Sequence, residues 1–215
     1  MKKIIALNGS PRRTGTTAQL LNKALDGARK AGAKTEFINL YTLKFTGCLS
    51  CFYCKRKGVP HGHCALRDDL SPVLEQMKKA DAILIGTPIY IFNITSATQA
   101  LLERFLFSNM LYTKENFVTL GKTIKTGLIY TMGMPKTMFD ETHFGDKMKL
   151  TEHSLATITG NPLEKLYSYD GIQFRDYSQY EADKLPEKER RIYLANQYPE
   201  DLKRAEAIGY HLIRS

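Results

Sequence analysis

Outside residues 48–64 the 215-residue sequence contains no cysteine, and all four of its cysteines fall in the segment CLSCFYCKRKGVPHGHC. This distribution excludes a scaffold held together by disulfides spread along the chain. A chain of this length buries an ordinary core without such cross-links, and its 43% hydrophobic and 25% charged residues are typical of globular proteins. We expect one domain that covers residues 1–215.

A long hydrophobic run is also missing from the N-terminal stretch MKKIIALNGSPRR, whose apolar run has only four residues. Four residues are too few for a signal peptide or a membrane span. The expectation is therefore a cytoplasmic protein with no membrane association. In that reducing compartment, clustered cysteines more often bind a metal or carry out redox chemistry than pair as disulfides.

The sequence is basic, with a net charge of +9, but it has no basic tail and no basic helix face interleaved with aromatic residues. Its basic residues instead form short groups such as Lys2-Lys3, Arg12-Arg13 and Arg190-Arg191. This pattern argues against nucleic acid as a partner and is typical of a solvated surface with one anion site.

Short apolar runs alternate with helical patterns along most of the chain. The predicted strands lie at about 2–10, 34–41, 81–90, 125–133 and 166–169. Helices are predicted to begin at Thr16, near Asp69 or Ser71 and at Thr95 or Ser96, with two more over about 149–159 and 200–213.

Apolar strands separated by helices indicate a parallel sheet that is covered on both faces. We therefore expect an α/β fold, a flavodoxin-like three-layer sandwich with a five-stranded, doubly wound sheet in the order 2-1-3-4-5. Ligands of such sheets bind at the carboxyl ends of strands one and three. A cysteine loop at 46–67 and a surface extension at about 175–199 are additions to this sheet.

The first predicted strand ends in NGSPRRTGTTAQLL, a loop rich in hydroxyl groups that enters a helix. The N-terminus of a helix suits a phosphate, and the spacing here matches neither GxGxxG nor a Walker loop. The loop fits the monophosphate of FMN. The candidate residues are Ser10, Arg12 or Arg13, Thr14, Gly15, Thr16 and Thr17, with Gly9 also permitting close backbone approach. The alternative is an ordinary turn whose serine and threonine side chains cap the helix.

Two further loops are expected at the same edge of the sheet. The segment TPIYIFNITS follows the third strand and can flank a flat ring, and TMGMP follows the fourth. The candidate ring-binding residues are Thr87, Pro88, Ile89, Tyr90, Phe92 and Asn93 in the first segment and Thr131, Met132 and Gly133 in the second. For Ile89 and Phe92, a simple place in the core is the alternative.

Four segments together resemble the family of NADPH-dependent FMN reductases and iron–sulfur flavoproteins, in the flavodoxin-like superfamily. They are GSPRRTGTT, GC-x2-C-x2-C followed by GHCALRDDL, TPIYIFNITSATQALLER and YPEDLKRAEAIGYHL. The resemblance implies that Ser10, Arg12, Gly15, Thr16 and Thr17 hold the FMN phosphate. It also implies that the isoalloxazine lies on Pro88, Ile89 and Tyr90 beside the loop Thr131–Gly133, and that the chain forms a homodimer or homotetramer.

The cysteines follow the spacing Cys48-x2-Cys51-x2-Cys54-x9-Cys64. Three cysteines at this spacing can point at one small volume, and a fourth can close a four-cysteine site. Thiolates suit a [4Fe–4S] cluster or zinc, and His61 or His63 could complete a mixed zinc site. A loop that holds no metal is the third possibility, and all three stay open.

The resulting hypothesis is an FMN-dependent oxidoreductase that passes electrons between NAD(P)H or ferredoxin, FMN and a small-molecule or protein acceptor, through a [4Fe–4S] cluster. Hydride transfer needs no acid or base from a side chain, so we name no catalytic residue. One alternative is an NAD(P)H-dependent FMN or quinone reductase with flavin alone. Others are a non-enzymatic electron carrier, which the charge of +9 disfavours, and a basic regulatory protein that keeps only the fold.

Overall fold

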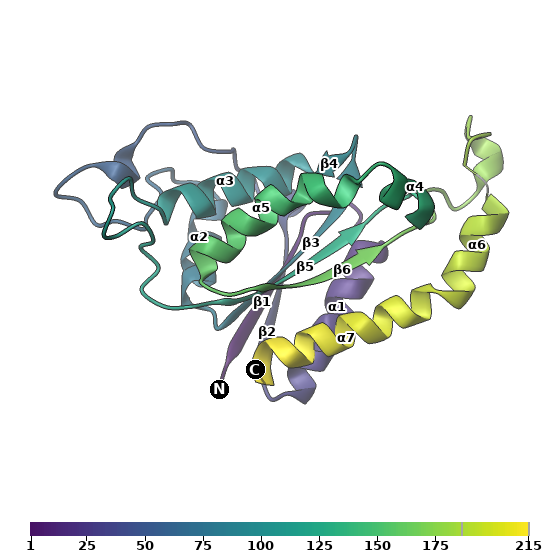
Figure 1. Ribbon diagram of the computed structural model, residues 1–215, viewed down its shortest axis with the longest axis horizontal. Helices are drawn as coiled ribbons and strands as arrows, with labels where there is room; N and C mark the ends of the chain where they lie inside the picture. Colours follow the sequence, from purple (N-terminus) through teal and green to yellow (C-terminus); the bar gives the residue numbers. More distant parts are fainter. Residues whose placement is uncertain (186, 215) are drawn as a thin grey trace.

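Five parallel strands form the centre of the molecule (Figure 1). The computed structural model describes residues 1–185 and 187–214. The sheet runs in the order β2 (Lys34–Asn39), β1 (Lys3–Asn8), β3 (Ala82–Tyr90), β5 (Lys125–Thr131) and β6 (Leu163–Ser168). Counted along the chain, these parallel strands have the order 2-1-3-4-5, so the predicted fold class is confirmed. A sixth strand, β4 (Asn93–Ile94), pairs antiparallel with the end of β3 and was not predicted.

Helices cover both faces of the sheet. One face carries α1 (Thr16–Lys30) and α7 (Tyr198–Arg214), and the other carries α2 (Leu70–Lys79), α3 (Ser96–Ser108) and α5 (Phe144–Thr159). Shorter elements are α4 (Lys136–Glu141), α6 (Glu187–Asn196), η1 (Leu40–Thr42), η2 (Tyr53–Lys55) and η3 (Tyr177–Gln179). Among the described residues, no helix is long and apolar enough to span a membrane.

The predicted helices are present: α1, α2 and α3 begin where predicted, while α5 and α7 begin earlier. Helix α5 begins at Phe144 rather than near Lys149, because Phe144 and Met148 are buried one turn apart while exposed polar residues lie between them. Asp69 occupies the cap position of α2, but its side chain makes no cap hydrogen bond. The neighbouring Asp68 accepts the amide of Leu70 instead, at 3.1 Å.

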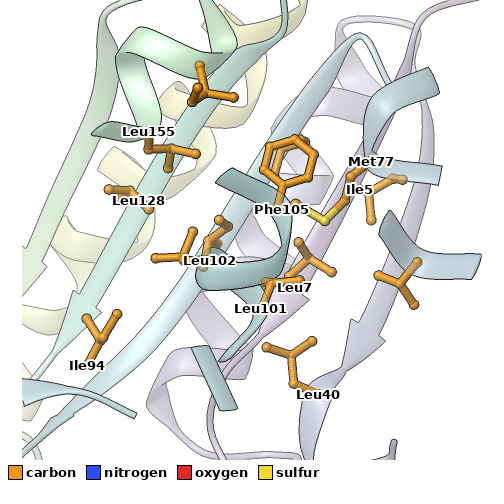
Figure 2. Packing of buried hydrophobic residues seen from close by; sticks show 14 of the residues in the cluster. Ile5, Leu7, Leu40, Met77, Ile94, Leu101, Leu102, Phe105, Leu128 and Leu155 are labelled. Carbon is orange, nitrogen blue, oxygen red and sulfur yellow. The ribbon is translucent and has the colours of Figure 1, made fainter. Parts of the chain in front are cut away.

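The strands are apolar along their length because both faces of the sheet are buried. In β1, Ile5 and Leu7 face the core beneath α2 and α3, while Ile4 and Ala6 face α1 and α7. Figure 2 shows Leu101, Leu102 and Phe105 of α3 gathered over the first of these faces. Alternation with a period of two residues therefore places successive side chains in two separate cores.

Helices α1 and α7 approach each other closely at two glycines. A Cβ atom added at Gly27 would lie 1.9 Å from the carbonyl oxygen of Glu206, and one added at Gly209 would lie 1.7 Å from that of Ala24. Both obstacles are backbone atoms, which cannot turn aside as a side chain can. The two helices can therefore pack at this distance only because each lacks a side chain at the crossing.

We expect Gly209→Ala to destabilise the fold by about 2 kcal/mol or more, since α7 must move away from α1 and leave a gap. In a helix without such a neighbour the same change stabilises by about 0.5–1 kcal/mol. The measurement is urea unfolding followed by circular dichroism. Gly145→Ala in α5 is the control, because its added Cβ atom would meet a side chain and not the backbone of another helix. The nearest atom is in the ring of Phe139, at 3.2 Å. Equal stability of the two variants would contradict this explanation.

Candidate functional site

Helix α1 begins without a side-chain cap. Its cap position is Gly15, no side chain accepts a hydrogen bond from the first-turn amides, and the first turn has no acidic residue. The serine and threonine residues of the loop therefore do not cap this helix, which disfavours the alternative of an ordinary capped turn. Amides at an uncapped helix N-terminus and the partial positive charge there attract an anion.

A set of buried hydrogen bonds fixes the shape of the loop between β1 and α1. The Asn8 side chain accepts the amide of Ser10 at 3.1 Å and donates to Asn39 Oδ1 at 2.7 Å. Gly9 donates its amide to the Gly86 carbonyl at 2.7 Å and accepts the Thr95 hydroxyl at 2.8 Å. A Cβ atom at Gly9 would lie 1.9 Å from Thr98 Oγ1. The close approach of α3 thus requires glycine here.

Neither Asn8 nor Thr95 was among the site residues predicted from the sequence. Asn8 could have been found, because a polar residue at the end of an apolar strand commonly bonds to the turn that follows. Thr95 was predicted only as a helix cap, and it does accept the amide of Thr98. Its hydroxyl also reaches the first loop, 86 residues earlier in the chain.

The predicted phosphate-binding residues divide into buried and exposed groups. Ser10 and Thr17 are buried, Arg12 and Thr14 are exposed, and Gly15 and Thr16 are partly exposed. Ser10 Oγ accepts the amide of Arg12 at 3.2 Å. The buried side chains therefore shape the loop, while the exposed ones and the amides of α1 remain accessible to a ligand.

Thr17 connects two of the three predicted loops. Its hydroxyl lies 2.7 Å from that of Thr131, the last residue of β5, and both side chains are buried. Thr131 in turn pairs with Pro88 across the sheet. The start of α1 and the ends of β3 and β5 therefore meet at one edge, as expected from the sequence.

Strand β3 extends through Tyr90 and turns directly into β4. Tyr90 pairs with Asn93, so Ile91 and Phe92 form the turn, with φ angles of 46° and 56°. Two left-handed residues are typical of a hairpin turn that favours asparagine and glycine, and a β-branched residue is strained there. Both side chains are exposed, so the strained turn places Ile91 and Phe92 in contact with solvent at the edge of the site.

The remaining ring-binding candidates differ in which of their groups are accessible to a ligand. The hydroxyl of buried Thr87 accepts the amide of Thr95 and donates to the Pro88 carbonyl, so it is already engaged. Met132 packs its side chain in the core, so only its backbone can face a ligand. Tyr90 is 44% exposed. Burial raises the pKa of its phenol while the charge of Arg12 opposes this, which places Arg12 near Tyr90.

The four cysteines lie elsewhere, beside the C-terminal half of α3. In Figure 1 this segment extends beyond the end of α3 opposite to β4. Lys55 Nζ bonds to the carbonyls of Phe107 and Met110, and the amide of Cys48 donates to Glu103 Oε2 at 3.2 Å. Because α3 has 13 residues, it separates the two regions by up to about 20 Å.

Cys48, Cys51, Cys54 and Cys64 all line one small cavity of about 20 Å³, together with Arg104 and Phe107. Burial raises the pKa of the Cys54 thiol, and Lys55 opposes this rise. Within the described ranges, no group of three or more His, Cys, Asp or Glu side chains converges to hold a metal ion. The φ angles of Ser50 and Phe52 are 50° and 54°, so two left-handed residues bend the chain between the cysteines.

Neither histidine of the loop joins the cysteine cavity. His61 Nδ1 lies 3.2 Å from the carbonyl of Cys54, and His63 Nδ1 lies 2.9 Å from Glu75 Oε1 and 3.0 Å from Lys78 Nζ. The structure therefore offers no support for histidine as a metal ligand in this loop.

Arg104 of α3 forms the wall of the cysteine cavity and was not selected from the sequence. Its side chain is fully buried and pairs with Asp68 at 2.5 Å. It also donates to the Thr46 carbonyl at 3.3 Å, while its Nε has no hydrogen-bond partner. Arg104 thus bonds both ends of the cysteine loop to α3, and its Nε–H donor remains without a partner.

The fold and this edge define a flavodoxin-like α/β protein in which the uncapped N-terminus of α1 lies at the point where the strand order reverses. Residues 2–127 match the family described as NADPH-dependent FMN reductase, which is more than half of the chain. The chain belongs to this family.

Three similar proteins are consistent with that assignment. An iron–sulfur flavoprotein of Methanocaldococcus jannaschii is 35% identical over 102 residues, which are 47% of this chain and 51% of that protein. One from Methanosarcina thermophila is 26% identical over 170 residues, 76% of this chain and 85% of that protein. The structure of an NAD(P)H:quinone oxidoreductase from Methanothermobacter marburgensis has a TM-score of 0.72 at 17% identity, covering 100% and 98% of the two chains.

The M. jannaschii relative and three others share only about half of their own length with this chain. The 17% identity to the solved structure shows a common fold. Family membership and fold are therefore established.

The ion pair of Arg104 and Asp68 predicts a pH-dependent stability. Burial alone would raise the pKa of Asp68, but the hydrogen bond and charge of Arg104 lower it below its ordinary value. The pair's contribution is therefore present above about pH 3.9 and is lost as the pH falls through the lower folded pKa. We expect Asp68→Asn to lose roughly 2–4 kcal/mol at pH 7, because it leaves Arg104 buried without its partner.

Urea unfolding of the wild type and Asp68→Asn from pH 7 to pH 3 measures this effect. The difference between the two proteins should shrink as the pH falls below about 3.9, because Asp68 of the unfolded chain is protonated there while the native carboxylate needs a still lower pH. Glu115→Gln, which changes an exposed carboxylate in another loop, should show no such trend. A difference that is constant across this range would contradict the assignment.

Proposed function

We propose that this chain is a single FMN-binding domain that acts as an NAD(P)H-dependent oxidoreductase and delivers electrons to a small-molecule or protein acceptor. The observation that carries the proposal is the uncapped N-terminus of α1, which lies beside the ends of β3 and β5 through the Thr17–Thr131 hydrogen bond. Membership in the NADPH-dependent FMN reductase family supports the choice of ligand.

The first loop suits the phosphate of FMN. The first-turn amides of α1 have no side-chain partner, and the exposed Arg12 and Thr14 can add a charge and a hydroxyl donor. The glycine at the cap position places no side chain between the helix end and an incoming phosphate. Ser10 and Thr17 act indirectly, since their hydroxyls hold the loop and its neighbour in place.

The loops after β3 and β5 suit the ring system. Pro88 and Ile89 are partly exposed at the end of β3, and Tyr90 offers an exposed aromatic surface beside Arg12. Phe92 and Asn93 follow in the hairpin, and the loop Thr131–Gly133 lies next to Pro88 through the β3–β5 register. FMN, when bound, accepts a hydride from NAD(P)H and passes its electrons to an acceptor.

The side chains at this edge orient and shield the ring rather than exchange protons with it. Thr87 is engaged with Thr95 and Pro88, and burial raises the pKa of Tyr90 above its already high ordinary value. Tyr90 therefore stays protonated at neutral pH and can act as a neutral surface and hydrogen-bond donor.

We also propose that Cys48, Cys51, Cys54 and Cys64 hold a [4Fe–4S] cluster. In support, all four line one cavity, and four cysteine thiolates are the usual ligands of such a cluster. Arg104 and Lys55 beside the cavity would offset the negative charge of the thiolates. The cavity of about 20 Å³ must widen to admit the group.

The partners follow from the same proposal. NAD(P)H is the donor for the flavin, and ferredoxin is an alternative donor if the cysteines carry single electrons. Because the cysteine cavity is lined by Arg104, Phe107 and Ser108 of α3 and the flavin loops lie at the start of this helix, about 12–18 Å of helix lies between them within one chain. We further propose a homodimer or homotetramer. The exposed Leu150 and a groove of about 900 Å³ between α3 and α5 support a surface suited to contact.

The phosphate loop is tested with Thr17→Val, which keeps the shape of the side chain and removes the bond to Thr131. An unpaired buried hydroxyl costs about 1–3 kcal/mol, so we expect the Kd for FMN to rise by about tenfold. Fluorescence titration of the apoprotein with FMN measures the change. Thr126→Val is the control, because Thr126 is a buried threonine at the opposite end of β5. An unchanged Kd for Thr17→Val would remove Thr17 from the site.

The activity and the cluster are tested together on protein purified without oxygen. We expect flavin absorption that bleaches on addition of NAD(P)H, with about four iron and four sulfide per chain. Cys51→Ser should lose most of the iron and keep the flavin, and Ser50→Ala should retain both. Flavin without iron would indicate a reductase that uses flavin alone. About one zinc per chain would show that the cysteines bind zinc instead of a cluster. Flavin that NAD(P)H does not reduce would indicate an electron carrier.

A further inference from the structure

Arg190 connects the C-terminal extension to the flavin loop. It lies on α6, which Figure 1 places beyond the ends of β5 and β6. Its side chain donates to the carbonyl of Gly133 at 2.7 Å and to the carbonyl of Gly171 at 2.9 Å. Gly133 belongs to the predicted ring-binding loop after β5, and Gly171 belongs to the loop after β6. One guanidinium therefore bonds to the loops after β5 and β6 at the edge of the sheet where the proposed ligand binds.

The burial of Arg190 is unusual for a charged residue. Only 4% of it is exposed, and in residues 1–185 and 187–214 no carboxylate lies within ion-pair distance of it. Its Nε has no hydrogen-bond partner. Asp170 is the nearby acidic group, since the charge of Arg190 opposes the rise that burial causes in the pKa of Asp170. A buried cation bonded only to carbonyls is costly, so a role in the site accounts for it better than a role in the core.

The loop that Arg190 holds is tightly constrained on that side. A Cβ atom at Gly133 would lie 2.3 Å from Gln173 Nε2 and 3.2 Å from Arg190 Nη1. Gly171 donates its amide to the Met132 carbonyl at 2.9 Å, and Asp170 donates to the Met134 carbonyl at 3.2 Å. The carbonyls of residues 132–134 therefore all point toward the loop after β6 or toward Arg190.

The direction of these carbonyls fixes the direction of the amides. In a trans peptide the C=O and the next N–H point to opposite sides. Because the Gly133 carbonyl points at Arg190, the amide of Met134 points away from it. Among the described residues, neither Gly133 nor Met134 donates its amide to a protein acceptor. The loop thus presents free donors on the face opposite to the guanidinium.

We propose that Arg190 is a positioning residue for the flavin site: it holds the Gly133–Met134 peptide so that its amide is free to bond the polar edge of the bound ring. This inference rests on the proposed FMN site. The positive charge of Arg190 also lies behind that peptide and favours negative charge on the ring in front of it. The extension at about 175–199 therefore completes the site through α6.

The test compares Arg190→Gln, Arg190→Lys and Arg191→Gln. Arg191 is the matched control, because it is the next residue of α6, is exposed and pairs with Glu187. The measured quantities are the Kd for FMN, the reduction potential of the bound flavin and its visible circular dichroism. We expect Arg190→Gln to raise the Kd by about tenfold, since hydrogen bonds from a charged group contribute about 1.5–3 kcal/mol. It should also lower the potential and change the dichroism.

Arg190→Lys keeps the charge but not the two-carbonyl fork, so it should restore the potential more than the Kd. Arg191→Gln should match the wild type in all three measurements. If Arg190→Gln binds FMN with wild-type affinity, potential and dichroism, or is only less stable to urea, the inference is overturned while the proposed function stands. If the wild type itself does not bind FMN, the proposed function fails first and the inference fails with it.

Discussion

The parallel pairing of β1, β3 and β5 is the constraint on which the rest of the structure depends. Because Asn8 lies opposite Gly86 and Pro88 opposite Thr131, the loops that leave these strands meet at one edge. The sheet also forces each connection to cross back over a face, which brings the N-termini of α1 and α3 to the same edge. The hydroxyl contacts of Thr17 and Thr95 then fix loops that the sheet has already brought together.

Helix α3 connects the edge of the sheet where these loops meet to the cysteine cavity. Its first turn is capped by Thr95, which also binds the first loop, and its second half carries Arg104 to the cysteine cavity. The face between these ends packs Leu101, Leu102 and Phe105 into the core (Figure 2). This packed face thus sets the relation between the two proposed redox regions, because neither end of α3 can move without disturbing it.

The part of this arrangement that is local in sequence could be predicted. Apolar runs and helical spacing gave the order of the parallel strands, and the loops at Ser10–Thr17 and Thr131–Gly133 were correctly placed at one edge. The rest depends on contacts between distant positions. Arg104 meets Asp68 from 36 residues away, and Arg190 meets Gly133 from 57 residues away. Each looks in the sequence like an ordinary surface arginine of an amphipathic helix, so only the assembled fold reveals its burial.

The two buried arginines each hold in place a segment that lies outside the minimal sheet. Segments 46–67 and 175–199 are additions to a minimal sheet, and a short loop or helix buries too little apolar surface to fix itself. In each case a guanidinium satisfies carbonyls of a loop, and in each case the Nε remains without a partner. Carbonyls and water would serve a purely structural loop at lower cost, since a buried charge must be compensated. Asp68 already balances the charge of Arg104, whereas the guanidinium of Arg190 bonds only to the carbonyls of Gly133 and Gly171. A negatively charged group at the proposed flavin site would therefore offset the charge of Arg190.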